Sequence, residues 1–145
     1  NMNEYKFFLI PLLALVINQI IKLLVFLIKG EFSWSQLFSY GGMPSSHTAL
    51  ATSLLITMGY FQGINSPEFA ITLIMAIVIV KDAAGIRRKI GKQASIINHL
   101  IKKLPAKEGY KFPILNERFG HTDTEILVGF LLSIVTTYLL INITI

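Results

Sequence analysis

The residues best suited to chemistry lie in three short polar blocks that interrupt apolar segments of the sequence. The first block, SYGGMPSSHTAL, contains Ser45, Ser46 and His47. Either serine can cap a helix that starts here, and the free N–H groups and positive dipole end of such a helix favour an anion. His47 would then lie beside the anion in the first turn. A serine cap with an incidental histidine is the simpler alternative.

The second block, GHTDTEILVG, places His121 and Glu125 four residues apart, on one face of a helix. A carboxylate that accepts from one imidazole nitrogen fixes the tautomer and leaves the other nitrogen as a nucleophile or base. Thr122 and Glu125 also have the spacing of a capping box, which would use the same carboxylate. The block therefore indicates a reactive histidine, a helix cap, or each in part.

The third block, KDAAGIRRKIGKQ, supplies cations. Lys81 and Arg88 are seven residues apart, so they share one face of a continuing helix, and Arg87 points about 100° away. Guanidinium groups suit phosphate oxygens. Asp82 and Gln93 of the same block are candidates for supporting roles. The alternative is a cluster of positive charge at a helix C-terminus beside the membrane.

Two further polar residues lie inside the first apolar segment. Asn18 and Lys22 are four residues apart and therefore on one helical face. A lysine within a membrane helix is costly, so we expect Lys22 to face the bundle interior and an anionic partner. Its side chain can instead extend along the helix to the membrane surface.

The elements that must position these residues are membrane helices. Of 145 residues, 53% are hydrophobic and 14% charged, and the mean hydropathy is +0.62. Cysteine is absent, which excludes disulfides and thiolate metal sites. The net charge is +5, but the basic residues alternate with apolar segments. An anionic membrane surface or substrate therefore explains the charge better than nucleic acid does.

Four segments approach the roughly 17–25 residues of a membrane-spanning helix. They are Tyr5–Lys29, Ser46–Gln62, Pro67 to about Lys81, and Thr122–Ile141. We expect one membrane-embedded domain over residues 1–145, an all-α bundle of about four transmembrane helices. The basic stretch from Arg87 to Arg118 would connect helices three and four, and its first part either continues helix three or lies on the membrane surface.

Four spans place both termini on one side of the membrane and all three polar blocks on the other. Lysine and arginine are concentrated with the blocks, so the positive-inside rule predicts that this side is cytoplasmic. Two helix N-termini, two histidines and several cations would then meet at one membrane face. That combination suits phosphoryl transfer. No group of three or four metal ligands presents itself, so we expect neither metal nor cofactor.

The blocks GGMPSSH, DAAGIRRKIGKQA and GHTDTE resemble the divergent bacterial branch of the type 2 phosphatidic-acid phosphatase and vanadium haloperoxidase superfamily, over nearly the whole chain. That superfamily has three motifs: a Lys followed seven residues later by Arg-Pro, then P-S-G-H, then S-R-x5-H-x3-D. Its last histidine attacks phosphorus, its aspartate orients that histidine, and the P-S-G-H histidine acts on the leaving group.

The resemblance implies that His47 is the general acid, with Ser46 in place of the motif glycine. It implies that His121 is the nucleophile, with Glu125 for the motif aspartate but without a preceding Ser-Arg. In the other alignment Arg87 starts the third motif and Gln93 replaces its histidine. Because glutamine cannot form a phosphohistidine, the first alignment is favoured, with Arg87 supplied from helix three.

The first motif also has two candidates. Lys81 and Arg88 have its spacing but follow P-S-S-H, whereas Lys22 and Lys29 have the expected order with Lys for Arg. The implied phosphate-binding residues are Ser45, Ser46, Lys81, Arg87, Arg88 and Lys22, supported by Asp82, Gln93 and Asn18.

These residues together predict a phosphatase that hydrolyses a lipid phosphomonoester or diphosphate through a phosphohistidine, in a bacterial cytoplasmic membrane with its site on the cytoplasmic face. Phosphatidate, phosphatidylglycerophosphate and polyprenyl diphosphate all suit an interfacial pocket. Membrane lipids are the expected partners, and lipid-facing surface could pair two copies. The alternatives are a non-catalytic protein that binds or moves an anionic lipid, and a small structural subunit.

Overall fold

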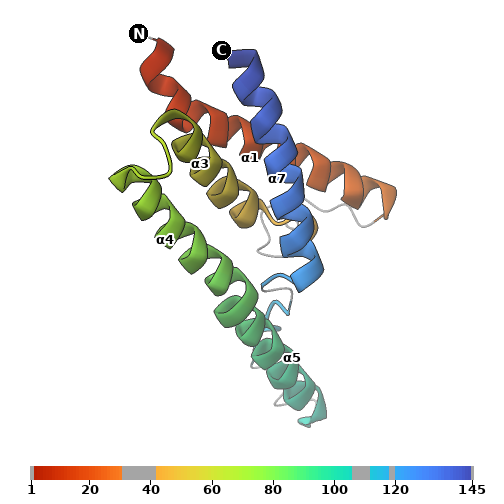
Figure 1. The fold of residues 1–145 in the computed structure, drawn as a ribbon. Helices are drawn as coiled ribbons and strands as arrows, with labels where there is room; N and C mark the ends of the chain where they lie inside the picture. The colour runs from red at the N-terminus through yellow and green to blue at the C-terminus, as the bar shows by residue number, and fades with distance from the viewer. Residues whose placement is uncertain (1, 31–41, 106–111, 118–119, 145) are drawn as a thin grey trace.

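The fold is a bundle of helices. The computed structural model describes residues 2–30, 42–105, 112–117 and 120–144 (Figure 1), and every regular element within those residues is helical. The elements are α1 (Met2–Ile28), α3 (Ser46–Phe61), α4 (Pro67–Lys81), the π-helical turn η1 (Asp82–Ile86), α5 (Arg87–Lys103) and α7 (Asp123–Thr144). The prediction of an all-α protein is confirmed.

Three helices are long and apolar enough to cross a membrane: Tyr5–Ile28, Pro67–Lys103 and Asp123–Ile143. The fourth expected span is α3, which has only 16 residues. At 1.5 Å per residue its length is about 24 Å, which is less than the roughly 30 Å hydrocarbon core of a bilayer. The described residues therefore hold three candidate spans, with the shorter α3 packed among them.

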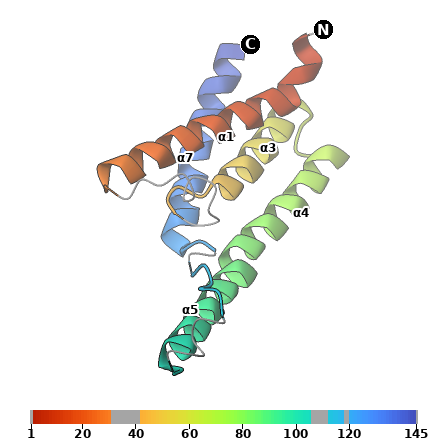
Figure 2. The ribbon, with the colours of Figure 1, turned by 180° about the vertical axis from the view of Figure 1, so that it is seen from behind.

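The basic stretch after Lys81 continues the third helix. The elements α4, η1 and α5 form one helical rod from Pro67 to Lys103, visible in both views of the ribbon (Figures 1 and 2). Of the two arrangements that the sequence left open for this stretch, the structure has the continuous helix. Pro67 occupies the first turn of α4, where a missing N–H costs nothing, and Ser66 caps it.

Helix α3 lies at the centre and packs against α1, α4 and α7. Its buried side chains are mostly small, as expected where membrane helices approach closely. Two hydrogen bonds join it to α7: the Ser133 hydroxyl donates to the Ala49 carbonyl at 2.7 Å, and the Thr137 hydroxyl donates to Ser53 Oγ at 2.7 Å. The core is thus held by close approach and polar contacts rather than by large apolar side chains.

The outer surface of the bundle is strongly apolar. Leu12, Val16, Ile20 and Leu24 form an exposed stripe along α1, and α4 exposes a similar set. An exposed apolar surface that extends along two helices would be unusual on a protein surrounded by water. It is expected where lipid chains are the solvent, so the surface agrees with a membrane location.

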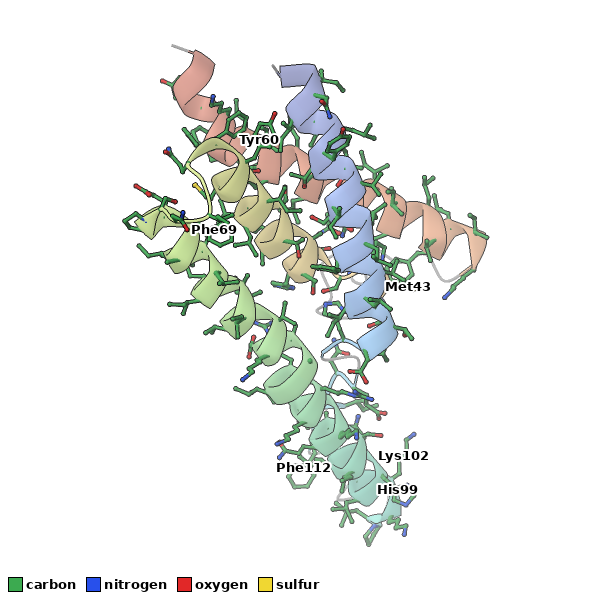
Figure 3. The ribbon with its side chains drawn as sticks, in the orientation of Figure 1. Met43, Tyr60, Phe69, His99, Lys102 and Phe112 are labelled. Carbon is green, nitrogen blue, oxygen red and sulfur yellow. The ribbon has the colours of Figure 1, made fainter. Side chains whose placement is uncertain are left out.

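The two ends of the bundle differ in character. Both termini lie at one end, together with Tyr60 and Phe69, whereas His99, Lys102 and Phe112 lie at the far end of α5 (Figure 3). The N-termini of α3 and α7 and the turn η1 lie away from the chain termini. The structure therefore brings the three polar blocks to one end, as the alternation of apolar segments predicted.

Candidate functional site

The N-terminus of α3 is fixed by Ser45. Its side chain accepts from the Thr48 N–H at 3.4 Å and from the Thr48 hydroxyl at 3.0 Å, so it is Ser45 that caps the helix. Its own N–H donates to the Glu125 carbonyl at 3.2 Å. A Cβ on Gly129 would lie 2.6 Å from the Ser45 carbonyl oxygen, so only glycine permits α7 to pack this closely.

Ser46 connects the same helix end to α1. Its hydroxyl accepts from Asn18 Nδ2 at 3.3 Å, and both residues are buried. The amide oxygen of Asn18 is also buried, and it accepts no hydrogen bond from the described residues. A buried acceptor of this kind needs a donor, such as a water molecule or a ligand hydroxyl.

Lys22 lies inside the bundle, with only 3% of its surface exposed. Glu125 is close enough to interact with it electrostatically, and Gly42 packs directly on its side chain. Gly42 has a φ of +95°, and a Cβ there would lie 2.7 Å from the Phe26 ring. The interior position was one of two expectations for Lys22, and extension to the membrane surface is excluded. Lys29, by contrast, is exposed.

Glu125 contacts both of the partners that the sequence suggested, His121 and Thr122. Its Oε2 lies 3.2 Å from His121 Nδ1 and accepts from the Thr122 N–H at 3.0 Å. The Glu125 N–H donates in return to the Thr122 hydroxyl at 3.3 Å, which completes the capping box. Because a carboxylate only accepts, the pair requires the proton on Nδ1, and Nε2 of His121 keeps its lone pair.

The π-helical turn η1 anchors His121 from the other side. The His121 N–H donates to the Ala83 carbonyl at 3.2 Å. Gly120 has a φ of +86°, and a Cβ there would overlap the backbone of Arg88. The wider spacing of a π-helix also brings Asp82 beside Arg87, whose Nε donates to Asp82 Oδ2 at 2.6 Å.

The two histidines meet between these elements. The ring centroids of His47 and His121 are 6.3 Å apart, with the ring planes at 57°. The charged groups that interact with His47 are Arg87, His121, Lys22 and Asp82. Side chains from α1, α3, the α4–α5 rod and α7 therefore form one cluster. The convergence of histidines and cations predicted from the sequence is present.

Other predicted residues lie apart from this cluster. Lys81 and Arg88 would share a face of a regular α-helix, but η1 changes the helical phase between them and they line different cavities. Arg88 forms an ion pair with Asp123, with Nη1 3.3 Å from Oδ1. Gln93 is exposed and lines neither cavity. Asp123 was not among the predicted site residues, although it lies within the GHTDTE block.

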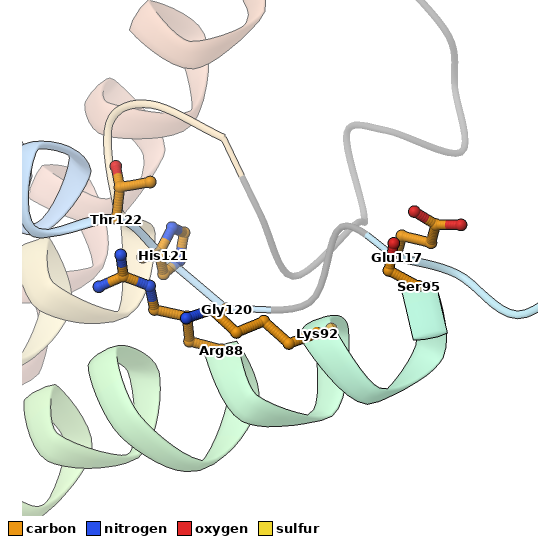
Figure 4. Close-up of a pocket in the computed structure, with 8 residues that line it drawn as sticks. Arg88, Lys92, Ser95, Glu117, Gly120, His121 and Thr122 are labelled. Atoms are coloured by element: carbon orange, nitrogen blue, oxygen red, sulfur yellow. The ribbon is translucent and has the colours of Figure 1, made fainter. Parts of the chain in front are cut away.

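The cavity that contains Arg88 is lined mainly by polar and charged residues (Figure 4). Its volume is about 270 Å³. Arg88, His121 and Thr122 lie at one end of it, and Ser95 and Glu117 lie at the other. Its lining is Arg88, Gly91, Lys92, Ser95, Glu117, Gly120, His121 and Thr122. His121 therefore lines the same space as two cationic side chains, Arg88 and Lys92.

Asn98 holds Glu117, which lines the far end of this cavity. Its amide group donates to the Leu115 carbonyl at 2.8 Å and accepts from the Leu115 N–H at 2.9 Å, while Nδ2 also reaches Glu117 Oε1 at 2.8 Å. Hydrogen bonds from Asn98 and Ser95 lower the pKa of Glu117. Sequence patterns gave no signal for Asn98, because its partners lie 17 and 19 residues away.

The described part of the chain contains no obvious set of metal ligands. No three His, Asp or Glu side chains there gather closely enough to hold a metal ion. The functional groups of the cluster are two imidazoles, the carboxylates of Glu125 and Asp82, and the cationic groups of Lys22 and Arg87. Such a set can bind an anion and exchange protons or a phosphoryl group with it.

Comparison with known proteins agrees with these features. The family model described as "Divergent PAP2 family" matches residues 3–136. The chain is 36% identical over 141 residues to the "Uncharacterized membrane protein YuiD" of Bacillus subtilis (strain 168), covering 89% of each chain. No solved structure matches significantly. The resemblance suggested by the three polar blocks is confirmed, and the chain belongs to the divergent PAP2 family of membrane proteins.

Proposed function

We propose that the protein is a membrane phosphatase that hydrolyses a lipid phosphomonoester or diphosphate. The observation that carries this proposal is the His121–Glu125 pair, at 3.2 Å, with the His47 ring 6.3 Å from the His121 ring. A carboxylate-oriented histidine is a competent nucleophile, and a second imidazole this close to it can reach an oxygen of the same phosphate ester.

In the first step, His121 Nε2 attacks phosphorus and the bond from phosphorus to the lipid oxygen breaks. The departing oxygen takes a proton from protonated His47. Lys22, Arg87 and the N–H groups at the start of α3 stabilise the negative charge on the phosphoryl oxygens. The products are a phosphohistidine and the free lipid alcohol, or the lipid monophosphate when the substrate is a diphosphate.

In the second step, water attacks the phosphohistidine. His47, now neutral, takes a proton from the water while the bond between phosphorus and Nε2 breaks. Inorganic phosphate leaves, and both histidines return to their starting states. Glu125 orients His121 in both steps and stabilises its positive form. No step requires a metal or another cofactor.

The site would act on phosphatidate, phosphatidylglycerophosphate or polyprenyl diphosphate, because each presents a phosphate at the membrane surface. The basic residues Lys89, Lys92, Lys102 and Lys103 of α5 lie on the same side as the histidines. By the positive-inside rule this would be the cytoplasmic side of a bacterial membrane. Membrane lipids would surround the exposed apolar faces, and one such face could pair with a second copy.

The test is release of inorganic phosphate from a panel of these three lipids by the purified protein in detergent. His121→Ala should abolish release. His99→Ala is the matched control, because His99 is an exposed histidine on α5 outside the cluster, and it should leave the rate unchanged. If the wild-type protein binds the lipids but neither forms a phosphoenzyme nor releases phosphate, the site is a non-catalytic anionic-lipid site.

A further inference from the structure

A second cavity, larger and mostly apolar, lies between α3, α4 and α7. Its volume is about 540 Å³, within the roughly 300–1,000 Å³ of small-molecule sites. The buried Thr48 and Thr52 of α3 form its floor. The remaining lining is Leu55, Leu73, Ala76, Ile77, Val80, Lys81, Asp123, Ile126, Leu127 and Phe130. We call this cavity the α4–α7 groove.

The α4–α7 groove opens through the side of the bundle. Helices α4 and α7 each pack against α3 but have little direct contact with one another. Ile77 on one wall is 49% exposed, and Leu127 and Phe130 on the other are 55% and 43% exposed. Since α4 and α7 belong to candidate membrane spans, this opening faces lipid chains rather than water.

The polar end of the groove meets the histidine cluster. Thr48, on the floor, directly follows His47, and Asp123 lies two residues after His121. Lys81 adds a cation at the same end. Arg88, which pairs with Asp123, lines the polar cavity on the other side of the segment 120–123. The segment 120–123 therefore separates a cavity that His121 lines from an apolar groove whose polar end holds Thr48 and Asp123, which are close in the chain to His47 and His121.

The dimensions of the groove suit one hydrocarbon chain. Its wall on α4 extends from Leu73 to Lys81, a rise of about 12 Å at 1.5 Å per residue. One leaflet of a bilayer contributes about 15 Å of hydrocarbon, half of the roughly 30 Å core. A lipid with its phosphate at the histidine cluster, beyond the Lys81 end of the groove, would have its chain alongside Ala76 and Phe130, at the depth where lipid chains already lie.

We propose that the α4–α7 groove holds one hydrocarbon chain of the lipid phosphate, which enters sideways from the membrane between α4 and α7. The identity of the phosphate rests on the proposed function, but binding of the chain does not require catalysis. The protein would then select substrates by a chain attached to the phosphate. Soluble phosphate esters without a chain would bind only through the polar end.

Photocrosslinking separates chain binding from catalysis. A phosphatidate analogue with a diazirine in one acyl chain is added to His121→Ala protein in phosphatidylcholine vesicles, and the labelled peptides are identified by mass spectrometry. We expect labelling concentrated on the α4 and α7 walls. Ala76→Trp should fill the groove and reduce the labelling of these two helices at least fivefold. Ala76→Leu and Ala76→Val should reduce the labelling less. The smaller variants preserve the test if tryptophan prevents folding.

Ala70→Trp is the matched control, because Ala70 is an exposed alanine of α4 that does not line the groove. It should leave the labelling unchanged. Labelling spread evenly over all lipid-facing helices, or equal loss in Ala70→Trp and Ala76→Trp, would overturn the proposal. So would a disulfide that joins two copies of Phe130→Cys protein, since a second chain would then fill the groove. Specific labelling of the His121→Ala protein, together with no phosphate release by the wild-type protein, would retain the groove and reject the phosphatase.

Discussion

The backbone N–H of His121 donates to the carbonyl of Ala83 at 3.2 Å, which ties the start of α7 to the π-helical turn of the α4–α5 rod. The reactive ring is thereby fixed from two directions, since Glu125 holds its Nδ1. The contact is possible because Gly120, next to His121, packs directly on the backbone of Arg88. The π-helical turn of the α4–α5 rod thus helps to position the side chain of His121, which lies just before α7.

Gly120→Ala should displace His121. The positive φ alone costs alanine about 1–2 kcal/mol, and the added Cβ overlaps the Arg88 backbone. A shift of about 1 Å in a reacting group costs roughly 10²-fold in rate, so we expect a loss of that size in phosphate release. Thermal unfolding in detergent reports the cost in stability.

Gly63→Ala is the control for that substitution. Gly63 has almost the same φ, +87°, but a Cβ there meets nothing within 4 Å. It should therefore lose stability through φ strain while keeping normal activity. Equal activity losses in both variants would mean that the close approach of Gly120 to the rod does not position the histidine.

Lys22→Met should weaken binding of a phosphate-like anion. A hydrogen bond to a charged group contributes about 1.5–3 kcal/mol, so the vanadate inhibition constant should rise about 10- to 100-fold. Stability should change little, because the variant also removes the cost of holding an ammonium group inside a membrane helix. Inhibition of phosphate release by vanadate measures the first effect, and thermal unfolding measures the second.

Lys29→Met distinguishes between the two interpretations of the first motif. Lys29 is exposed, whereas Lys22 is buried beside the histidines. The vanadate inhibition constant of Lys29→Met should therefore equal that of the wild type. If both lysines prove equally important, they act as one phosphate-binding motif, and Lys29 must move toward the histidines when the anion binds.

Local patterns in the sequence predicted the parts of the site that depend on local geometry. The i,i+4 spacing of His121 and Glu125, and of Asn18 and Lys22, is a property of any α-helix. The helix start at Ser45 follows from its capping chemistry. None of these inferences requires knowledge of which helices are neighbours.

The features that were missed depend on departures from regular geometry or on distant partners. A π-helical turn has no simple sequence pattern, and it separated Lys81 from Arg88, which a regular helix would keep on one face. Asn98 bonds to Leu115 across 17 residues, through a segment without helical periodicity. The close approach at Gly120 is likewise visible only when the α4–α5 rod is in place.

The orientation in the membrane is tested with cysteines, since the natural chain has none. Asn65 lies in the connection between α3 and α4, at the end that holds both termini, and Lys103 is the last residue of α5. A membrane-impermeant thiol reagent should label Asn65→Cys in intact cells and label Lys103→Cys only after permeabilisation. The reverse pattern would place the histidine cluster outside the cytoplasm.

Substrates with different leaving groups distinguish the roles of the two histidines. His121→Ala should abolish both turnover and the acid-labile phosphoenzyme, because no nucleophile remains. His47→Ala should slow hydrolysis of lipid phosphates by roughly 10²–10⁴-fold, the usual contribution of a general acid. Nitrophenolate departs without a proton, so His47→Ala should still release a burst of it from nitrophenyl phosphate, in an amount equal to the enzyme. Rapid-mixing absorbance measures the burst, and a quench with base, in which phosphohistidine is stable, preserves the phosphoenzyme for measurement.

The opposite pattern would exchange the two roles. A phosphoenzyme that survives in His121→Ala and disappears in His47→Ala would make His47 the nucleophile, and Glu125 would then orient the acid instead. The distance between the rings, 6.3 Å, is compatible with attack from either side. What favours His121 is its carboxylate partner, because Glu125 holds Nδ1 and so fixes the tautomer of His121 for attack through Nε2. A fully active His121→Ala protein would end the phosphohistidine mechanism.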